Sequence, residues 1–274
     1  MTYPVSAGRP VDHVVIAVRD LSLAGATWSA LGFQVSPIMQ HLALGSSNRV
    51  VGFGSTYVEL LGSVENMISP HREGWLERFA YGEGLASVAF RSQDLVADHA
   101  KLIESGVAMT AIASARRAVT MPDGAAAETD SDFAYLETAS PFPTAFLVSH
   151  KAPETIFIPA FAIHANTALD IVRITFLSAN PAGDLEAVAP LSAGVPPIDF
   201  VSHDEAVASL GDHAPPLVQG ASFGIGLTIA VASLDACRTS FRPGIAFAEA
   251  DGALLVPASA ATGVSLRFIE RKSS

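Results

Sequence analysis

The stretch Asp12-His13-Val14-Val15-Ile16-Ala17-Val18-Arg19-Asp20-Leu21 decides the fold, because its signals change from strand to helix within a few residues. β-branched residues crowd its first half, as is typical of a buried strand. Asp20 then supplies a side chain that begins helices by accepting hydrogen bonds from their first free amides. We expect this helix to end at Leu31-Gly32-Phe33, where glycine permits the left-handed backbone of a helix terminus.

The same order of strand, cap, helix and glycine recurs along the chain. A strand is predicted over Ser87 to Ser92, followed by a cap at Asp94 and a stop at Gly106, and the distance from Asp to Gly is 12 residues in both copies. Weaker copies begin near Asp170 and Gly226. More strand-like segments follow each helix, so the repeating unit is βαβββ. Four units predict an α+β fold of tandem modules in two domains, each a curled mixed sheet around a cavity. The alternative is an ordinary α+β domain whose strands happen to look alike.

Prolines mark the expected boundary between the two halves. Pro153 and Pro159 interrupt an apolar stretch, Ala152 to Asn166, that has no clear helical period. The predicted domains are therefore residues 11–155, holding modules 1 and 2, and residues 165–272, holding the more divergent modules 3 and 4.

The composition excludes several classes of protein. The 274 residues carry a formal net charge of -11, which argues against binding to a phosphate backbone. Half of the residues are hydrophobic and only 16% are charged, so the chain should bury a large core. Cys237 is the one cysteine, so neither an intramolecular disulfide nor a cysteine zinc site is expected. Without a signal peptide or an apolar membrane span in the sequence, we expect a cytoplasmic protein.

These motifs resemble the glyoxalase-like group of the vicinal oxygen chelate superfamily, the glyoxalase, bleomycin resistance protein and dihydroxybiphenyl dioxygenase type. The likeness rests on the opening strand and helix, on the segments that follow them and on later landmarks: His41, Gly45 and Asn48, Arg49 to Gly54, Thr56 to Gly62, Gly82 to Leu85, Pro122 to Gly124, His164 to Asn166 and Gly263 to Glu270. It implies paired βαβββ modules and, in many members, a divalent metal in the cup between two modules. Members include lyases, isomerases, epimerases, extradiol dioxygenases, transferases and metal-free drug-sequestering proteins, so the fold does not name the reaction.

The resemblance implies metal ligands on the first and fourth strands of a module, where this chain has His13 and Glu59. A carboxylate between Val58 and Leu60 is costly to bury unless it meets a cation or hydrogen-bond donors. A metal would supply that partner; a structural His–Glu hydrogen bond or a partly exposed strand end is the alternative. His41, before a glycine- and serine-rich turn, completes a predicted set of two imidazoles and one carboxylate with positions left for two substrate oxygens.

The other modules depart from the family pattern. The position of His13 holds Ser87, Arg173 and Gly226 in modules 2, 3 and 4, the strand at Ala145 to Ser149 has no carboxylate, and Arg267 stands where the fourth module would have an acid. A set of two His and two Glu is therefore absent. Either three or fewer protein ligands hold the metal, with His41, His150 or His164 replacing a missing one, or no metal binds.

Six residues are predicted to bind substrate: Asn48, Arg116, His164, Asn166, Arg173 and Arg267. Arg116 belongs to a rare pair of cations that suits a carboxylate, although a solvated strand edge explains the pair as well. His164 and Asn166 match a family landmark, or else fasten the linker. Arg173 and Arg267 would face each other if modules 3 and 4 form one cup. His150, beside Lys151, is interpreted as a surface residue.

The leading hypothesis is a metal-dependent enzyme, a lyase, isomerase or dioxygenase acting on a small oxygenated molecule by chelation of adjacent oxygens. The ion would be Fe, Mn, Zn or Ni, and Glu59 the catalytic base. The alternative is a metal-free binding or sequestering protein of the same fold; a pseudo-enzyme is a third possibility. A homodimer is expected from the habit of the superfamily, and neither nucleic acid nor membrane is expected as a partner.

Overall fold

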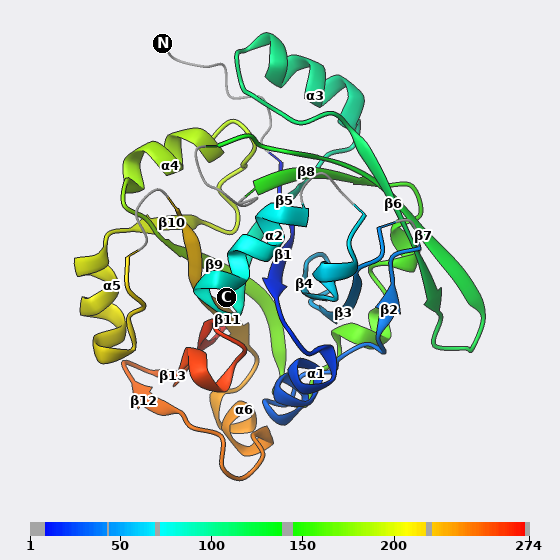
Figure 1. Ribbon diagram of the computed structural model, residues 1–274. Helices are drawn as coiled ribbons and strands as arrows, with labels where there is room; N and C mark the ends of the chain where they lie inside the picture. Colours follow the sequence, from blue (N-terminus) through cyan, green and yellow to red (C-terminus); the bar gives the residue numbers. More distant parts are fainter. Residues whose placement is uncertain (1–8, 43, 69–71, 139–144, 218–220, 272–274) are drawn as a thin grey trace.

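The computed structural model describes residues 9–42, 44–68, 72–138, 145–217 and 221–271. Two curled mixed sheets dominate it, with helices packed around them (Figure 1). The predicted α+β fold of tandem modules with curled mixed sheets is confirmed, but among the described residues the third module has only two strands, Ala168–Leu177 and Ile198–Val201, and a helix, His203–Leu210, in place of the others. None of the helices in the described part of the chain is long and apolar enough to cross a membrane.

The first sheet has eight strands in the order β2-β3-β4-β1-β5-β8-β7-β6. Its strands are β1 (Val11–Ala17), β2 (Met39–Gln40), β3 (Ser47–Gly52), β4 (Tyr57–Gly62), β5 (Gly84–Arg91), β6 (Ala113–Thr120), β7 (Ala126–Tyr135) and β8 (Ala145–His150). The helices of this half are α1 (Leu21–Ala30), α2 (Arg72–Arg78) and α3 (Leu95–Glu104). A bridge between His41 and Arg117 joins the chain after β2 to β6, so the two ends of the sheet meet.

The second sheet has six strands in the order β10-β9-β11-β14-β13-β12. Its strands are β9 (Ala168–Leu177), β10 (Ile198–Val201), β11 (Phe223–Val231), β12 (Ala248–Ala250), β13 (Ala253–Val256) and β14 (Ser265–Glu270). Its helices are α4 (Pro181–Val188), α5 (His203–Leu210) and α6 (Leu234–Ser240).

Helix starts follow the sequence signals. Asp20 accepts hydrogen bonds from the amides of Ser22 and Leu23 at the start of α1, and Asp94 accepts one from the amide of Ala97 at the start of α3. Asn180 and Ser233 cap α4 and α6 in the same way. The predicted caps Asp20 and Asp94 are confirmed.

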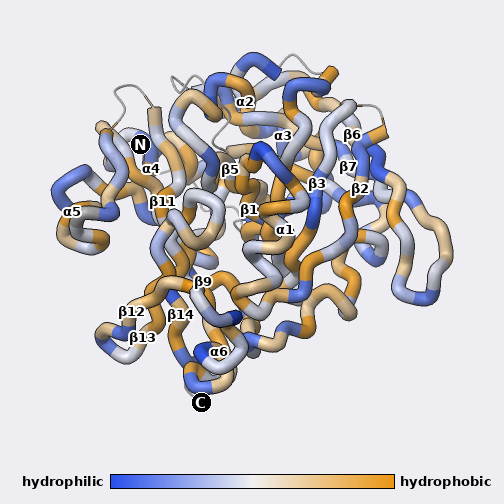
Figure 2. The backbone as a smooth tube through the Cα atoms, turned by 60° about the horizontal axis from the view of Figure 1, so that its bottom comes forward, coloured by the Kyte–Doolittle hydropathy of each residue, from blue (hydrophilic) through white to orange (hydrophobic). Residues whose placement is uncertain are grey.

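One apolar core joins the two sheets, and Figure 2 shows the hydrophobic strands running through the middle of the molecule. Ile16 of β1, Trp28 of α1 and Phe268 of β14 belong to the same buried cluster. The sheets touch so closely that a Cβ on Gly224 would lie 2.1 Å from the side chain of Leu85. Because this core is shared, the predicted domain limits of 11–155 and 165–272 stay a prediction.

Along the strands of the first sheet, successive side chains point alternately into the apolar core and into a cavity. Val14 and Ile16 face the helices, whereas His13 and Val15 face the inside of the curl. There they line a cavity of about 100 Å³. The fold thus leaves the concave side of the first sheet as the place for a ligand.

Candidate functional site

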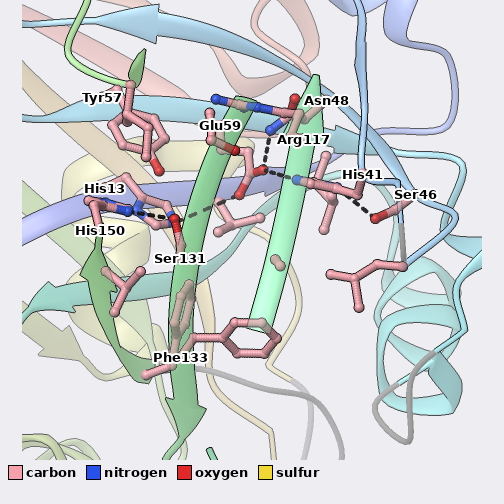
Figure 3. Close-up of a pocket in the computed structure, with 18 of the residues that line it drawn as sticks. His13, His41, Ser46, Asn48, Tyr57, Glu59, Arg117, Ser131, Phe133 and His150 are labelled. Carbon is pink, nitrogen blue, oxygen red and sulfur yellow. Dashed lines mark hydrogen bonds and ion pairs between the residues drawn. The ribbon is translucent and has the colours of Figure 1, made fainter. Parts of the chain in front are cut away.

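The cavity inside the first sheet brings together polar side chains from strands that lie far apart in the sequence (Figure 3). Those that line it are His13, His41, Ser46, Asn48, Tyr57, Glu59, Arg117, Thr129, Ser131 and His150. Its apolar lining includes Val15, Leu44, Leu61, Met67, Trp75, Phe133, Tyr135, Phe146, Val148 and Ile156. A mostly apolar pocket with a few converging polar groups is the usual form of a small-molecule site.

Glu59 lies among the polar groups, with a side chain only 13% exposed. Its Oε1 accepts a 2.5 Å hydrogen bond from Nδ2 of Asn48. Burial alone would raise the pKa of the carboxyl, but His13, His41, the bond from Asn48 and the charge of Arg117 together outweigh burial and lower the pKa below its ordinary value. Glu59 is therefore an ionised carboxylate facing the cavity at neutral pH.

Two imidazoles approach this carboxylate. Nε2 of His13 lies 3.7 Å from Oε2 of Glu59, and Nε2 of His41 lies 3.7 Å from Oε1. Both distances are too long for hydrogen bonds. Burial lowers the pKa of His41 to about 4, and the positive charge of Arg117 adds to this, so His41 is neutral at pH 7.

Asp12, which is fully buried, orients the imidazoles beside it. Its Oδ1 lies 2.8 Å from Nδ1 of His13 and 2.9 Å from Nε2 of His150, and its Oδ2 accepts a 2.6 Å bond from Nε of Arg91. Burial raises the pKa of Asp12, but the bonds to His13 and His150 lower it far below its ordinary value. An ionised carboxylate can only accept hydrogen bonds. His13 therefore holds a proton on Nδ1, and in its neutral form presents a lone pair on Nε2 to the cavity.

Arg117 is the cation of the site. It is only 5% exposed and lines the cavity, and its Nε has no hydrogen-bond partner. The neighbouring Arg116 points the other way: its side chain is 60% exposed and lies within 3.7 Å of Glu128 and 3.5 Å of Asp130. The cation in the cavity is therefore the second residue of the pair, not the predicted Arg116.

The predicted metal ligands lie together but do not fit a metal centre. One ion would need His13, His41 and Glu59 to surround a single point, yet the two imidazoles approach different oxygens of the carboxylate, and Figure 3 shows Glu59 between them. One of these oxygens already accepts the bond from Asn48. Among the residues that the structure describes, no group of three or more His, Cys, Asp or Glu is placed to hold a metal ion.

The other predicted substrate residues lie outside this cavity, except Asn48. His164 accepts a hydrogen bond from the amide of Gln34 and bonds the carbonyl of Gly52, and Asn166 bonds the carbonyl of Leu31. These contacts hold the segment between the sheets against the first module. This is the fastening role that the sequence left open.

Arg173 and Arg267 belong to the second sheet. Both pair with Thr228, Arg173 from β9 and Arg267 from β14, so they lie on one face with Thr228 between them. Arg173 forms an ion pair with Asp199 and is largely exposed. Neither arginine lines the cavity of the first sheet.

The sequence analysis favoured a surface position for His150 and assigned no role to Asp12. The interpretation of His150 as a surface residue is wrong: its side chain is 4% exposed, lines the cavity and bonds both Asp12 and Ser131. The position of His150 at the end of β8, on the same face as Phe146 and Val148, was an available signal. Asp12 was quoted in the opening motif, but nothing there showed its buried role.

Comparisons with known proteins agree with this architecture. A family model described as a glyoxalase-like domain matches residues 11–191. No curated protein matches the chain significantly. The solved structures that share the fold at low identity include three with TM-scores above 0.5. A hypothetical protein from Staphylococcus aureus has a TM-score of 0.66 and 11% identity, covering 96% of this chain and 99% of that chain.

The second structure is a mutant of 4-hydroxymandelate synthase from Streptomyces coelicolor, with a TM-score of 0.58, 10% identity and coverage of 97% of this chain and 94% of that chain. The third is a xylose isomerase-like TIM barrel/4-hydroxyphenylpyruvate dioxygenase fusion protein, with a TM-score of 0.55, 13% identity and coverage of 99% of this chain and 50% of that chain. The resemblance to the glyoxalase-like group of the vicinal oxygen chelate superfamily is confirmed.

Proposed function

The chain belongs to the glyoxalase-like domain family, and we propose that it is an enzyme that removes a proton from a small oxygenated organic molecule in the cavity of its first sheet. The observation that carries this proposal is Glu59, a buried carboxylate that stays ionised beside a cavity. An ionised carboxylate that faces a cavity with little water has the protonation state that a general base needs. Proton removal next to a carbonyl or carboxyl group is the step that an isomerase or a lyase needs.

The neighbouring groups support that step. When Glu59 takes the proton, negative charge develops on the oxygens of the substrate, and the guanidinium of Arg117 stabilises it. His13 presents a lone pair on Nε2 3.7 Å from the carboxylate, so it is placed to take the proton onward. Asp12 keeps the proton of that imidazole on Nδ1 and stabilises the imidazolium that forms.

Hydrogen exchange with the solvent tests this proposal directly. Small oxo acids, hydroxy acids and hydroxyketones are incubated with the protein in deuterium oxide, and loss of their C–H signals is followed by proton NMR. Glu59→Gln should slow exchange by about 10²- to 10⁴-fold, the usual contribution of a general base. Glu65→Gln, which changes an exposed glutamate, is the matched control and should exchange like the wild type. Equal exchange in Glu59→Gln and the wild type contradicts the proposal.

Participation of a divalent metal stays a prediction from the superfamily resemblance. The chemistry proposed above uses only side chains of the chain. Metal analysis of untagged protein, loaded in turn with Fe, Mn, Zn and Ni, tests the prediction. One bound ion per chain that is lost in both His13→Ala and Glu59→Ala would support the metal-dependent mechanism instead. A homodimer is likewise a prediction, tested by sedimentation equilibrium.

A second candidate function is binding without chemistry. The aromatic side chains of Trp75, Phe133, Tyr135 and Phe146 form much of the cavity wall, as suits a protein that sequesters an apolar molecule. This alternative is favoured if a compound binds in the cavity and is recovered without exchange of any carbon-bound hydrogen.

A further inference from the structure

Arg117 carries a buried positive charge without a hydrogen-bonded counterion. None of the ion pairs within 4 Å between described residues includes its guanidinium, and its Nε has no hydrogen-bond partner. Glu59 influences the guanidinium only through space. Burying a guanidinium in this way is expensive, so its place at a cavity wall is best explained by a ligand that supplies the missing acceptor.

Asn48, in contrast, has a buried acceptor atom that lacks a hydrogen-bond donor. Its Nδ2 donates to the ionised Glu59, which fixes the orientation of the amide. Its Oδ1 is then left buried without a hydrogen-bond partner. Asn48 therefore offers an unused acceptor, and Arg117 offers unused donors, in the wall of one cavity.

We propose that Arg117 and Asn48 recognise a small hydroxycarboxylate, whose carboxylate binds the guanidinium and whose hydroxyl donates to Oδ1 of Asn48. A planar carboxylate matches the fork of donors on arginine, and a hydroxyl is a donor that an amide oxygen accepts. The cavity of about 100 Å³ suits a ligand of a few heavy atoms. This inference names the substrate class of the same cavity, and it rests on the proposed function only in taking this ligand as the substrate.

The charge of Glu59 opposes that of the ligand. Replacing the carboxylate by an amide removes this repulsion while it also removes the general base. Glu59→Gln should therefore bind a hydroxycarboxylate at least as tightly as the wild type but lose hydrogen exchange. Binding without exchange in this variant separates the recognition step from the proposed chemistry.

Isothermal titration calorimetry with glycolate and lactate tests the proposal. Acetate, which lacks the hydroxyl, and ethylene glycol, which lacks the carboxylate, are the comparison ligands. The wild type should bind the hydroxycarboxylates more tightly than acetate and should not bind ethylene glycol. Arg117→Met should weaken lactate binding by about 30-fold or more, whereas Arg116→Met, the exposed neighbour on the same strand, should change it less than about twofold.

Thermal unfolding supplies a second readout that guards against misfolding. Because Arg117→Met removes an uncompensated buried charge, the free variant should unfold at the same temperature as the free wild type or higher. Lactate should raise the unfolding temperature of the wild type and of Arg116→Met but not that of Arg117→Met. Arg117→Lys keeps the charge without the fork and should bind with intermediate affinity. Lactate binding that is unchanged in Arg117→Met, absent in the wild type at millimolar concentrations, or matched by ethylene glycol overturns the proposal. If lactate binds through Arg117 but no exchange occurs, the recognition proposal stands and the proposed function fails.

Discussion

Replacing Asp12 by Asn should destabilise the protein strongly, although the two side chains have the same shape. Asp12 accepts from three donors: Nδ1 of His13 at 2.8 Å, Nε2 of His150 at 2.9 Å and Nε of Arg91 at 2.6 Å. An amide has only one acceptor oxygen, so in either orientation its NH₂ group faces at least one of these donors. Breaking a buried charged network from one side costs about 3 to 5 kcal/mol. For a protein of this size such a loss lowers the unfolding temperature by roughly 10 °C.

The pH dependence of this effect has a definite sign. The pKa of Asp12 in the folded protein is far below its ordinary value, because the bonds from His13 and His150 outweigh the effect of burial. Its stabilisation is therefore fully present above pH of about 4, the ordinary value for Asp, and is lost as the pH falls further toward the lowered pKa of the folded state. The gap in stability between wild type and Asp12→Asn should narrow below pH 4.

Urea unfolding at pH 7, 5 and 3 measures this gap. The matched control is Asp199→Asn, which removes the carboxylate of an exposed ion pair with Arg173 and should cost no more than about 1 kcal/mol. The reasoning is refuted if Asp12→Asn is as stable as the control at pH 7, or if its deficit remains constant down to pH 3.

Two further predictions concern buried titratable groups. Burial lowers the pKa of His41 to about 4, so between pH 6.5 and 4 the unfolded chain takes up a proton that the folded chain does not. The wild type should therefore lose more stability than His41→Gln when the pH falls from 7 to 5. Midpoints of urea unfolding measure this difference. Burial raises the pKa of Cys237 to about 12, so this thiol should resist an aromatic disulfide reagent at pH 8 in the folded protein and react at once in denaturant. Rapid colour release from native protein would contradict the second prediction.

The modules could be predicted from sequence because their signals are local. A β-branched run, an Asp cap and a closing glycine each act within a few residues, and α1 and α3 begin where these signals placed them. His13 and Glu59 could also be predicted from the sequence, since the family pattern places both on strands that face the cup. They do line one cavity, although their spacing with His41 is not that of a metal centre.

Asp12 could not be assigned because its role depends on an irregular strand pairing. Neighbours on a regular strand point to opposite faces, so Asp12 and His13 should diverge. The pairing of β1 with β5 shifts register between Val11 and His13, and this bulge leaves Asp12 without a cross-strand partner. Its carboxylate can then reach His13 and His150 together. A bulge of this kind leaves no mark in a single sequence.

The buried position of Arg117 could in principle be predicted from the sequence. Along β6 the buried residues are Arg117 and Val119, while Arg116 and Ala118 are exposed. The period of two therefore selects the second arginine for the interior, provided that the strand has been recognised. The segment has only one large apolar residue, Val119, so its composition does not indicate a buried face.

Closure of the first sheet explains why the site formed there and not in the second. Strands β6 and β7 form a long hairpin, with eight and ten residues. This hairpin reaches the chain after β2, where the amide of Leu42 donates to the carbonyl of Arg116 and His41 pairs with Arg117. Both residues of that pairing line the cavity. The matching hairpin of the second sheet, β12 and β13, has strands of three and four residues. Strands this short do not bring the two ends of the sheet together. Arg173 therefore stays on an open face and finds its counterion in Asp199, while Arg117 is enclosed and left for a ligand to neutralise.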